Sequence, residues 1–299
     1  MSDTTAVPVS VPIVTERRCI VTVHAHPDDE SSKGPGTIAR YRAEGVRTIL
    51  VCCTDGAEGD IHNPALDAVA VKADLKNVRR RELEEATAII GYDRVIHLDY
   101  RDSGMADSEA NAHPESFHQA PLNEAAEKLV AILREERPQV LITYPDVQDQ
   151  YPHPDHLKVH DISMAAFLAS GDASAFPSAG PAHQVDRLFY VTWPAERVRK
   201  MHEMFLELGL ESPYDAEFLA RIDAHVDDAT HKVDISGFGH IRELALKAHA
   251  TQVDPTSKWW FGLPSDVQAE IYPFEHYRLA LPVPAGAPQD ASDLFEGLA

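Results

Sequence analysis

The chain has 299 residues, with 48 acidic and 27 basic side chains, a formal net charge of −21 and a pI near 5.1. Such an acidic surface repels phosphate backbones and anionic lipid headgroups, and the one basic run, Arg79-Arg80-Arg81, is too short to offset it, so neither nucleic acid nor a membrane is an expected partner. A composition of 44% hydrophobic and 25% charged residues is that of a globular protein and excludes disorder for most of the chain.

The start of the chain and its cysteines indicate a cytoplasmic protein. The first residues, MSDTTAVPVSVPIV, lack the basic segment of a signal peptide, and no run of about 18 apolar residues predicts a membrane helix. Cys19, Cys52 and Cys53 lie in apolar runs, without the spacing of a disulfide framework or a C-x-x-C pair. We expect three buried, reduced thiols and a soluble chain.

Short β-branched runs alternate with amphipathic segments as far as residue 192. The runs predict buried parallel strands at 19–23, 46–53, 94–98, 140–143 and 188–192, and the segments predict helices at 35–44, 72–91, 122–137 and 157–169. This alternation predicts an α/β fold with a doubly wound, mostly parallel sheet of the Rossmann type. Ligands bind such sheets beyond the carboxyl ends of the strands, so the residues that follow each strand are the candidates for chemistry.

Beyond residue 195 the pattern becomes mainly helical, at 197–208, 216–225 and 236–251, and no further strong strand run follows. We expect an α/β core over 17–194 and a smaller, mainly helical C-terminal lobe over 195–281 that is continuous with it. The ends, 1–16 and 282–299, are rich in proline or in small polar residues and are predicted to be loosely held arms. Within the lobe, His249 is expected to be a buried structural histidine, and the aromatic residues 259–261 to belong to a core cluster rather than to the wall of a cleft.

A turn rich in metal-binding side chains follows the first predicted strand: His24-Ala-His26-Pro27-Asp28-Asp29-Glu30. His26 and Asp29 are three residues apart and can converge on one ion if the corner enters a helical turn, and imidazole and carboxylate both bind Zn²⁺. Asp28 would then lie beside the ion, where a general base that activates water belongs. The alternative is a helix N-terminus capped by Asp28 or Asp29. His24, inside the strand, is expected to be a hydrogen-bonded scaffold residue.

Two more histidines three residues apart follow the fourth predicted strand, in Tyr151-Pro-His153-Pro-Asp155-His156. His156 could complete a His-Asp-His set for Zn²⁺, or for Fe²⁺, that leaves a position open for water or substrate. His153 would face the substrate as a proton donor that is protonated in the resting enzyme, with Asp155 orienting it or raising its pKa. Histidines at sheet edges are often structural, but two such motifs after two strands of one sheet favour a metal site.

The two histidine motifs resemble those of the LmbE-like (PIG-L) family of zinc-dependent N-deacetylases and amidases, which act on N-acylated glucosamine derivatives. The resemblance spans most of the chain and includes the segments 56–60, 79–83, 101–105 and 249–255. It implies an LmbE-like fold and the following roles: His26, Asp29 and His156 as zinc ligands, Asp28 as general base, His153 as general acid, Asp155 as the group that tunes His153, and Tyr151 as a group that helps to hold the oxyanion.

The resemblance also implies how a small amino-sugar substrate would be held. Arg79 and Asp102 match residues that contact sugar and inositol hydroxyls, and Lys33 stands where the family's amidases have lysine and its deacetylases differ. Segments 30–34, 151–156 and 274–277 are most similar to the amidases, whereas 101–105 is closer to the deacetylases, and 56–60 and 146–150 depart from the amidase pattern. We expect an amidase acting on an N-acylated glucosamine derivative, with a glucosaminyl-inositol deacetylase or an enzyme for another N-acyl amino sugar as the alternatives.

Two other classes of function fit parts of the pattern. The sheet alone suggests a nucleotide-binding oxidoreductase, but the glycines in 32–36 and 56–59 lack the G-x-G-x-x-G spacing, and an acidic corner stands where a pyrophosphate would bind. A metal-binding or sugar-binding module without catalysis would need neither Asp28 nor His153. The presence of both residues favours an enzyme.

Overall fold

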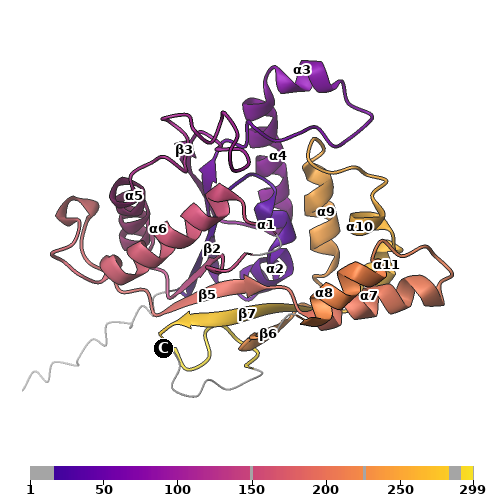
Figure 1. Ribbon diagram of the computed structural model, residues 1–299. Helices are drawn as coiled ribbons and strands as arrows, with labels where there is room; N and C mark the ends of the chain where they lie inside the picture. Colours follow the sequence, from indigo (N-terminus) through magenta and orange to yellow (C-terminus); the bar gives the residue numbers. More distant parts are fainter. Residues whose placement is uncertain (1–16, 149–150, 225–226, 283–290, 299) are drawn as a thin grey trace, which may run out of the picture.

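The strands form one sheet in the order β3-β2-β1-β4-β5-β7-β6 (Figure 1). The structure, a computed structural model, describes residues 17–148, 151–224, 227–282 and 291–298. Its strands are β1 (Cys19–His24), β2 (Arg47–Thr54), β3 (Arg94–Tyr100), β4 (Val140–Thr143), β5 (Arg187–Thr192), β6 (His231–Asp234) and β7 (Phe274–Leu281). Its helices are α1 (Asp29–Ser32), α2 (Pro35–Ala43), α3 (Ala68–Lys72), α4 (Leu75–Ile90), α5 (Leu122–Glu136), α6 (Pro154–Ser170), the short 3-10 helix η1 (Pro177–Ala179), α7 (Ala195–Glu207), α8 (Ala216–Ala224), α9 (His240–Ala248), α10 (Lys258–Phe261) and α11 (Ser265–Glu270).

The first five strands are parallel, which confirms the predicted α/β sheet. They are apolar because helices cover both faces of the sheet, and β1 is buried over its whole length. The helices α5 and α6 pack together on one face, and α4 packs with α9 on the other (Figure 1). Two predicted helices are too long: 72–91 is α4 (Leu75–Ile90), which begins after its N-cap Asp74, and 236–251 is α9 (His240–Ala248). The separate short helix α3 before α4 was not predicted.

The strand order explains why the two histidine motifs meet. The chain runs outward from β1 to β2 and β3, and it returns through α5 to β4 on the other side of β1. The order of the strands therefore reverses between β1 and β4, and in such sheets ligands bind beyond the carboxyl ends of the strands at this point. The turn with His26 leaves β1 at this point, and the segment that leads to His156 leaves β4 there.

The expectation that no strand follows residue 195 is wrong, because β6 and β7 extend the sheet. Strand β7 pairs antiparallel with both β5 and β6. Its sequence, FEHYRLAL, contains charged residues that find distant partners: Glu275 accepts hydrogen bonds from the N–H groups of Gly36 and Thr37 at the start of α2. Because polar side chains of β7 form hydrogen bonds with remote segments, its sequence lacks the continuous apolar run that would predict a strand.

The helical part of the expected lobe has its own apolar cluster, from α7, α8 and nearby residues: Val198, Met201, Phe205, Tyr214, Ile222 and Leu263. Trp259 packs against this cluster, as expected for the aromatic segment. None of the helices in the described ranges is both long and apolar enough to cross a membrane.

The end of the chain is held more firmly than the sequence predicts. Leu294 and Phe295 are fully buried in the main core, and the Leu294 N–H donates a hydrogen bond to the Tyr41 hydroxyl. The prediction of a loosely held tail is therefore wrong for 291–298. Leu294 and Phe295 pack into the core, although the small and acidic residues around them suggested an exposed segment. The other predicted arm, 1–16, lies outside the described residues.

Candidate metal centre

The turn after β1 brings His26, Asp28 and Asp29 to the end of the strand. Asp28 has a φ of 124°, which non-glycine residues rarely adopt and which costs of order 1–3 kcal/mol. The His26 N–H donates a hydrogen bond to Asp29 Oδ2 at 2.9 Å, and this bond fixes the shape of the turn. His24, in β1, is buried with its Nδ1 3.2 Å from the Tyr144 hydroxyl, which confirms its scaffold role.

The second motif lies at the start of α6. His153 is the N-cap, Pro154 is the first helical residue, and the Asp155 N–H donates a hydrogen bond to His153 Nδ1 at 3.2 Å. A side chain that accepts from the first turn and a proline at the first position are both typical of helix starts. The first turn of α6 thus directs Asp155 and His156 into the interior, where each is less than a tenth exposed.

The two turns bring His26, Asp29 and His156 together as the sequence predicts. Each offers a ligand atom within 4.8 Å of those of the other two, and all three side chains are buried. Asp29 is central: its Oδ2 lies 3.5 Å from His26 Nδ1, and its Oδ1 lies 3.4 Å from His156 Nε2. Two imidazoles and one carboxylate form a donor set that could hold a divalent metal ion.

The electrostatics of these residues fit a bound cation. His156 Nε2 is buried and faces the Asp29 carboxylate without a hydrogen bond of normal geometry, and burial lowers the pKa of His156, so the ring is a neutral potential ligand. Burial alone would raise the pKa of Asp29, but the nearby Lys33 and His156 outweigh it and hold this pKa well below its usual range. Burial likewise opposes a charge on His26, yet Asp102, Asp155 and Asp29 raise the His26 pKa well above its usual value. A cation would replace the His26 proton as the positive charge among these carboxylates.

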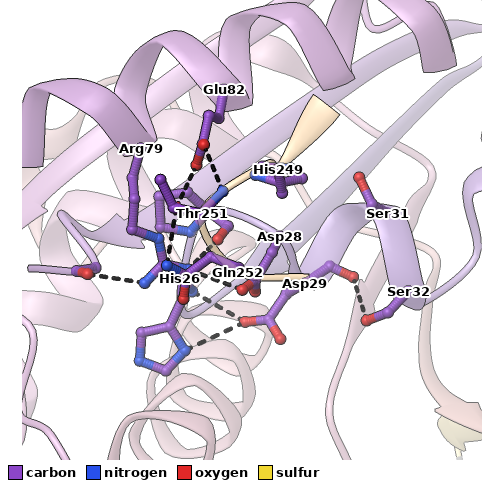
Figure 2. Close-up of polar contacts among 12 residues, drawn as sticks. His26, Asp28, Asp29, Ser31, Ser32, Arg79, Glu82, His249, Thr251 and Gln252 are labelled. Carbon is purple, nitrogen blue, oxygen red and sulfur yellow. Dashed lines mark hydrogen bonds and ion pairs between the residues drawn. The ribbon is translucent and has the colours of Figure 1, made fainter. Parts of the chain in front are cut away.

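Asp28 is the accessible carboxylate of the site. Its side chain is 30% exposed, compared with 5% for Asp29, 4% for Asp102 and 0% for Asp155. Arg79 reaches from α4 and places Nη2 at 2.8 Å from Asp28 Oδ2, as Figure 2 shows. Partial burial raises the pKa of Asp28, and the Arg79 guanidinium opposes this shift.

The structure corrects the predicted state of His153. Burial, with the charge of His26, lowers the His153 pKa to about 4, so the ring is neutral near pH 7 and not protonated as expected. Because Nδ1 accepts the Asp155 N–H, the proton of the neutral ring is on Nε2. The Asp155 carboxylate accepts from the N–H and hydroxyl of Ser103 and lies 3.3 Å from His26 Nε2. Asp155 contacts His153 through its backbone N–H, and its carboxylate charge raises the His153 pKa, as predicted, but burial and His26 outweigh it.

Tyr151 covers this group from the open side. It is 54% exposed, and its ring centroid lies 5.8 Å from that of His153 and 5.5 Å from that of His156. An exposed phenol above two site histidines is accessible to a ligand at this site.

The three predicted substrate-binding residues lie at the site but bond within it. Lys33 Nζ is 2.5 Å from Asp29 Oδ1 and 3.2 Å from Ser32 Oγ. Asp102 accepts from the N–H of Gly104, and its Oδ1 lies 3.6 Å from His26 Nε2. The Arg79 side chain is 3% exposed and binds the Pro27 and Gly56 carbonyls besides Asp28. Contact of these residues with a substrate stays a prediction.

Sequence reasoning missed several residues that support the site. The Tyr144 hydroxyl accepts the Ala25 N–H at 3.1 Å, and its ring stacks on His156 at 4.6 Å. His249 is buried as expected, but its Nε2 lies 2.6 Å from Glu30 Oε1, a pairing between residues 219 positions apart. The position of Tyr144 directly after β4 was a usable signal, whereas nothing local links Glu30 with His249.

Comparison with known proteins agrees with this arrangement. Residues 21–167 match the model of the PIG-L family, described as GlcNAc-PI de-N-acetylase. The chain is 39% identical over 295 residues to the mycothiol S-conjugate amidase of Streptomyces coelicolor, covering 95% of this chain and 99% of that protein. It is 36% identical over 294 residues to the 1D-myo-inositol 2-acetamido-2-deoxy-alpha-D-glucopyranoside deacetylase of Geodermatophilus obscurus, with the same coverage of both chains.

Among solved structures, the N,N'-diacetylchitobiose deacetylase of Pyrococcus horikoshii is similar with a TM-score of 0.59 at 18% identity, covering 88% of this chain and 84% of that one. At this identity the likeness shows the fold alone. The family match, the two relatives aligned over nearly their full length and the His-Asp-His group agree. This chain belongs to the PIG-L (LmbE-like) family and is a hydrolase of amide bonds.

Proposed function

We propose that this chain is a zinc-dependent hydrolase that cleaves the amide bond of an N-acylated glucosamine derivative, with a mycothiol S-conjugate as its substrate. The observation that carries the proposal is the accessible carboxylate of Asp28 beside the buried group of His26, Asp29 and His156. A site that only binds a metal has no use for an additional open carboxylate with a raised pKa, whereas hydrolysis needs a base for the attacking water.

The proposed zinc ligands are His26, Asp29 and His156, and the same donors also suit Fe²⁺. When bound there, the ion supplies a Lewis acid that lowers the pKa of water toward ~7 and polarises a carbonyl group. Asp29 is suited to this duty because its carboxylate faces both histidines.

Asp28 is the proposed general base. Arg79 holds Oδ2 and leaves Oδ1 without a hydrogen-bond partner among the described residues, so one oxygen is oriented by the protein and the other is available to water. The raised pKa of Asp28 brings the carboxylate closer to the working pH. It can therefore take a proton from the attacking water and return it to the nitrogen of the departing amine.

His153 and Tyr151 are proposed to stabilise the oxyanion of the tetrahedral intermediate. The predicted role of His153 as general acid requires an imidazolium, but its pKa of about 4 and the bond at Nδ1 favour a neutral ring with the proton on Nε2. A neutral Nε2–H donates a hydrogen bond to an oxyanion without transferring its proton. We therefore assign the proton transfer to Asp28, with Asp155 holding the His153 ring through its backbone N–H.

The sugar is proposed to bind along Lys33, Arg79 and Asp102. Lys33 supports the amidase assignment through the sequence resemblance, which implies a lysine at this position in the family's amidases. A glucosaminyl-inositol deacetylase is the second candidate, and it is supported by the segment 101–105 and by the 36% identical relative with that activity. Another N-acyl amino sugar is a third substrate class. We place the reaction in the cytoplasm, supported by the free, buried thiols of Cys19, Cys52 and Cys53.

The test measures the primary amine released by the zinc-loaded protein from a mycothiol S-conjugate and from N-acetylglucosaminyl-inositol. The proposal expects release from the conjugate at a higher kcat/KM. A higher value for the acetylated compound supports the deacetylase instead. Release from neither compound by protein with full zinc content would contradict both assignments.

A further inference from the structure

A buried carboxylate–imidazole pair lies behind the proposed base and has no part in the mechanism above. His249, at the C-terminal end of α9, places Nε2 at 2.6 Å from Glu30 Oε1, and both side chains are completely buried. The second oxygen of the carboxylate, Glu30 Oε2, accepts the backbone N–H of Asp28 at 2.9 Å. The pair thus links the end of α9 to the backbone of the proposed base. Figure 2 shows His249 and Asp28 on the same side of the site.

The peptide group between Pro27 and Asp28 is held by an anionic side chain at its N–H and by a cationic side chain at its carbonyl oxygen. Its N–H donates to the Glu30 carboxylate, and its carbonyl oxygen accepts a hydrogen bond from the Arg79 guanidinium. The orientation of this peptide plane sets φ of Asp28, which is 124°. A non-glycine residue keeps such a conformation only where the surrounding structure imposes it. The two charged contacts supply that constraint.

His249 determines which oxygen of Glu30 is free for this task. Oε1 of Glu30 accepts from both His249 Nε2 and the Ser31 hydroxyl, and Oε2 is left for the Asp28 N–H. A completely buried carboxylate keeps its charge and its rotamer only when it is paired and hydrogen-bonded. Without His249, Glu30 loses its buried hydrogen-bond partner, and the hold on the Asp28 backbone weakens.

We propose that Glu30 and His249 are positioning residues that orient the Asp28 carboxylate by clamping the Pro27–Asp28 peptide group. This inference rests on the proposed role of Asp28 as base. It gives the C-terminal part of the chain a defined contribution to a site built otherwise from the turns after β1 and β4.

The same segment offers a matched control. Thr251 donates from its N–H and its hydroxyl to the two carboxylate oxygens of Glu82, at 2.8 and 2.7 Å, and this contact ties the segment to α4. Both of these side chains are also buried, and their two hydrogen bonds do not involve the turn that carries Asp28. Thr251→Val therefore loosens the segment without removing the clamp.

The test compares His249→Leu, His249→Gln and Thr251→Val in the full-length, zinc-loaded protein. For His249→Leu we expect kcat to fall roughly 10- to 100-fold, the range found for partners that orient an active-site group, with KM and zinc content unchanged. Amide hydrogen exchange, measured by mass spectrometry on the peptide that contains Asp28, should become faster. His249→Gln should recover most of both losses because its amide donates to Glu30, and Thr251→Val should resemble the wild type in both.

Wild-type kcat and wild-type exchange in a folded His249→Leu variant would overturn the inference, as would an equal loss in Thr251→Val. If His249→Leu does not fold, Glu30→Gln takes its place with the same expected losses. If the wild-type protein hydrolyses neither compound, the proposed function fails, and the exchange measurement alone still decides whether Glu30 and His249 hold the Asp28 backbone.

Discussion

Replacing Asp28 by asparagine removes the proposed base and keeps the shape of the side chain. The asparagine oxygen can still accept from Arg79, whose Nη2 lies 2.8 Å from the carboxylate, and Arg79 keeps the Pro27 and Gly56 carbonyls. Loss of a general base lowers kcat by roughly 10²- to 10⁴-fold, equivalent to about 3–5 kcal/mol of transition-state stabilisation. Replacing the charge-assisted bond to Arg79 with a neutral one should cost about 1 kcal/mol of unfolding free energy.

The assay combines three measurements on Asp28→Asn: kcat from released amine, zinc per chain after dialysis, and the free energy of urea unfolding. We expect a folded protein with full zinc and almost no turnover. Wild-type kcat in this variant would refute the assignment of the base. Loss of zinc together with activity would make Asp28 a metal ligand, which also contradicts the mechanism.

Three other predictions follow from individual residues. His156→Ala removes a proposed ligand, so dialysed protein should lose its metal in elemental analysis, and unchanged zinc content would exclude His156. Gly56→Ala should destabilise the fold by more than about 1 kcal/mol and lower kcat, because a Cβ at this φ of +65° would clash with Arg79 Nη1. Gly45→Ala, at φ +88° with no neighbouring atom within 4 Å, is the control. Equal effects of the two variants in denaturant melts and on kcat would contradict the clash. Burial lowers the pKa of His231 to about 4, so between about pH 6.5 and pH 4 the unfolded chain binds a proton at this residue and the folded chain does not. As the pH falls through this range, the free energy of unfolding should decrease by up to about 3 kcal/mol. In urea unfolding, His231→Gln should show a smaller decrease over the same pH range.

The parallel half of the sheet could be predicted because its residues carry a local signal. Strands buried on both faces are continuous apolar runs, and the five predicted runs coincide with β1 to β5 within two residues at each end. The candidate metal group was predictable for the same reason. His26 with Asp29, and His153 with His156, are close in sequence at strand ends, and the strand order brings the two turns together.

The remaining features depend on contacts between distant residues. Strand β7 is stabilised by pairing with β5 and β6 and by the bond of Glu275 to the start of α2, so its own sequence looks polar. The state of His153 depends on burial and on the position of its Nδ1 at a helix start, and its residue type alone suggested the opposite charge. The pairing of Glu30 with His249 likewise arises only when α9 packs beside α1.

Whether the turns after β1 and β4 hold one cation can be determined by anomalous diffraction at the zinc absorption edge from crystals of the zinc-loaded protein. We expect a peak ligated by His26, Asp29 and His156 at about 2.0–2.2 Å from their ligand atoms. A peak on the neighbouring group of His26, Asp102 and His153 alone, or no peak between the two turns, would contradict this expectation.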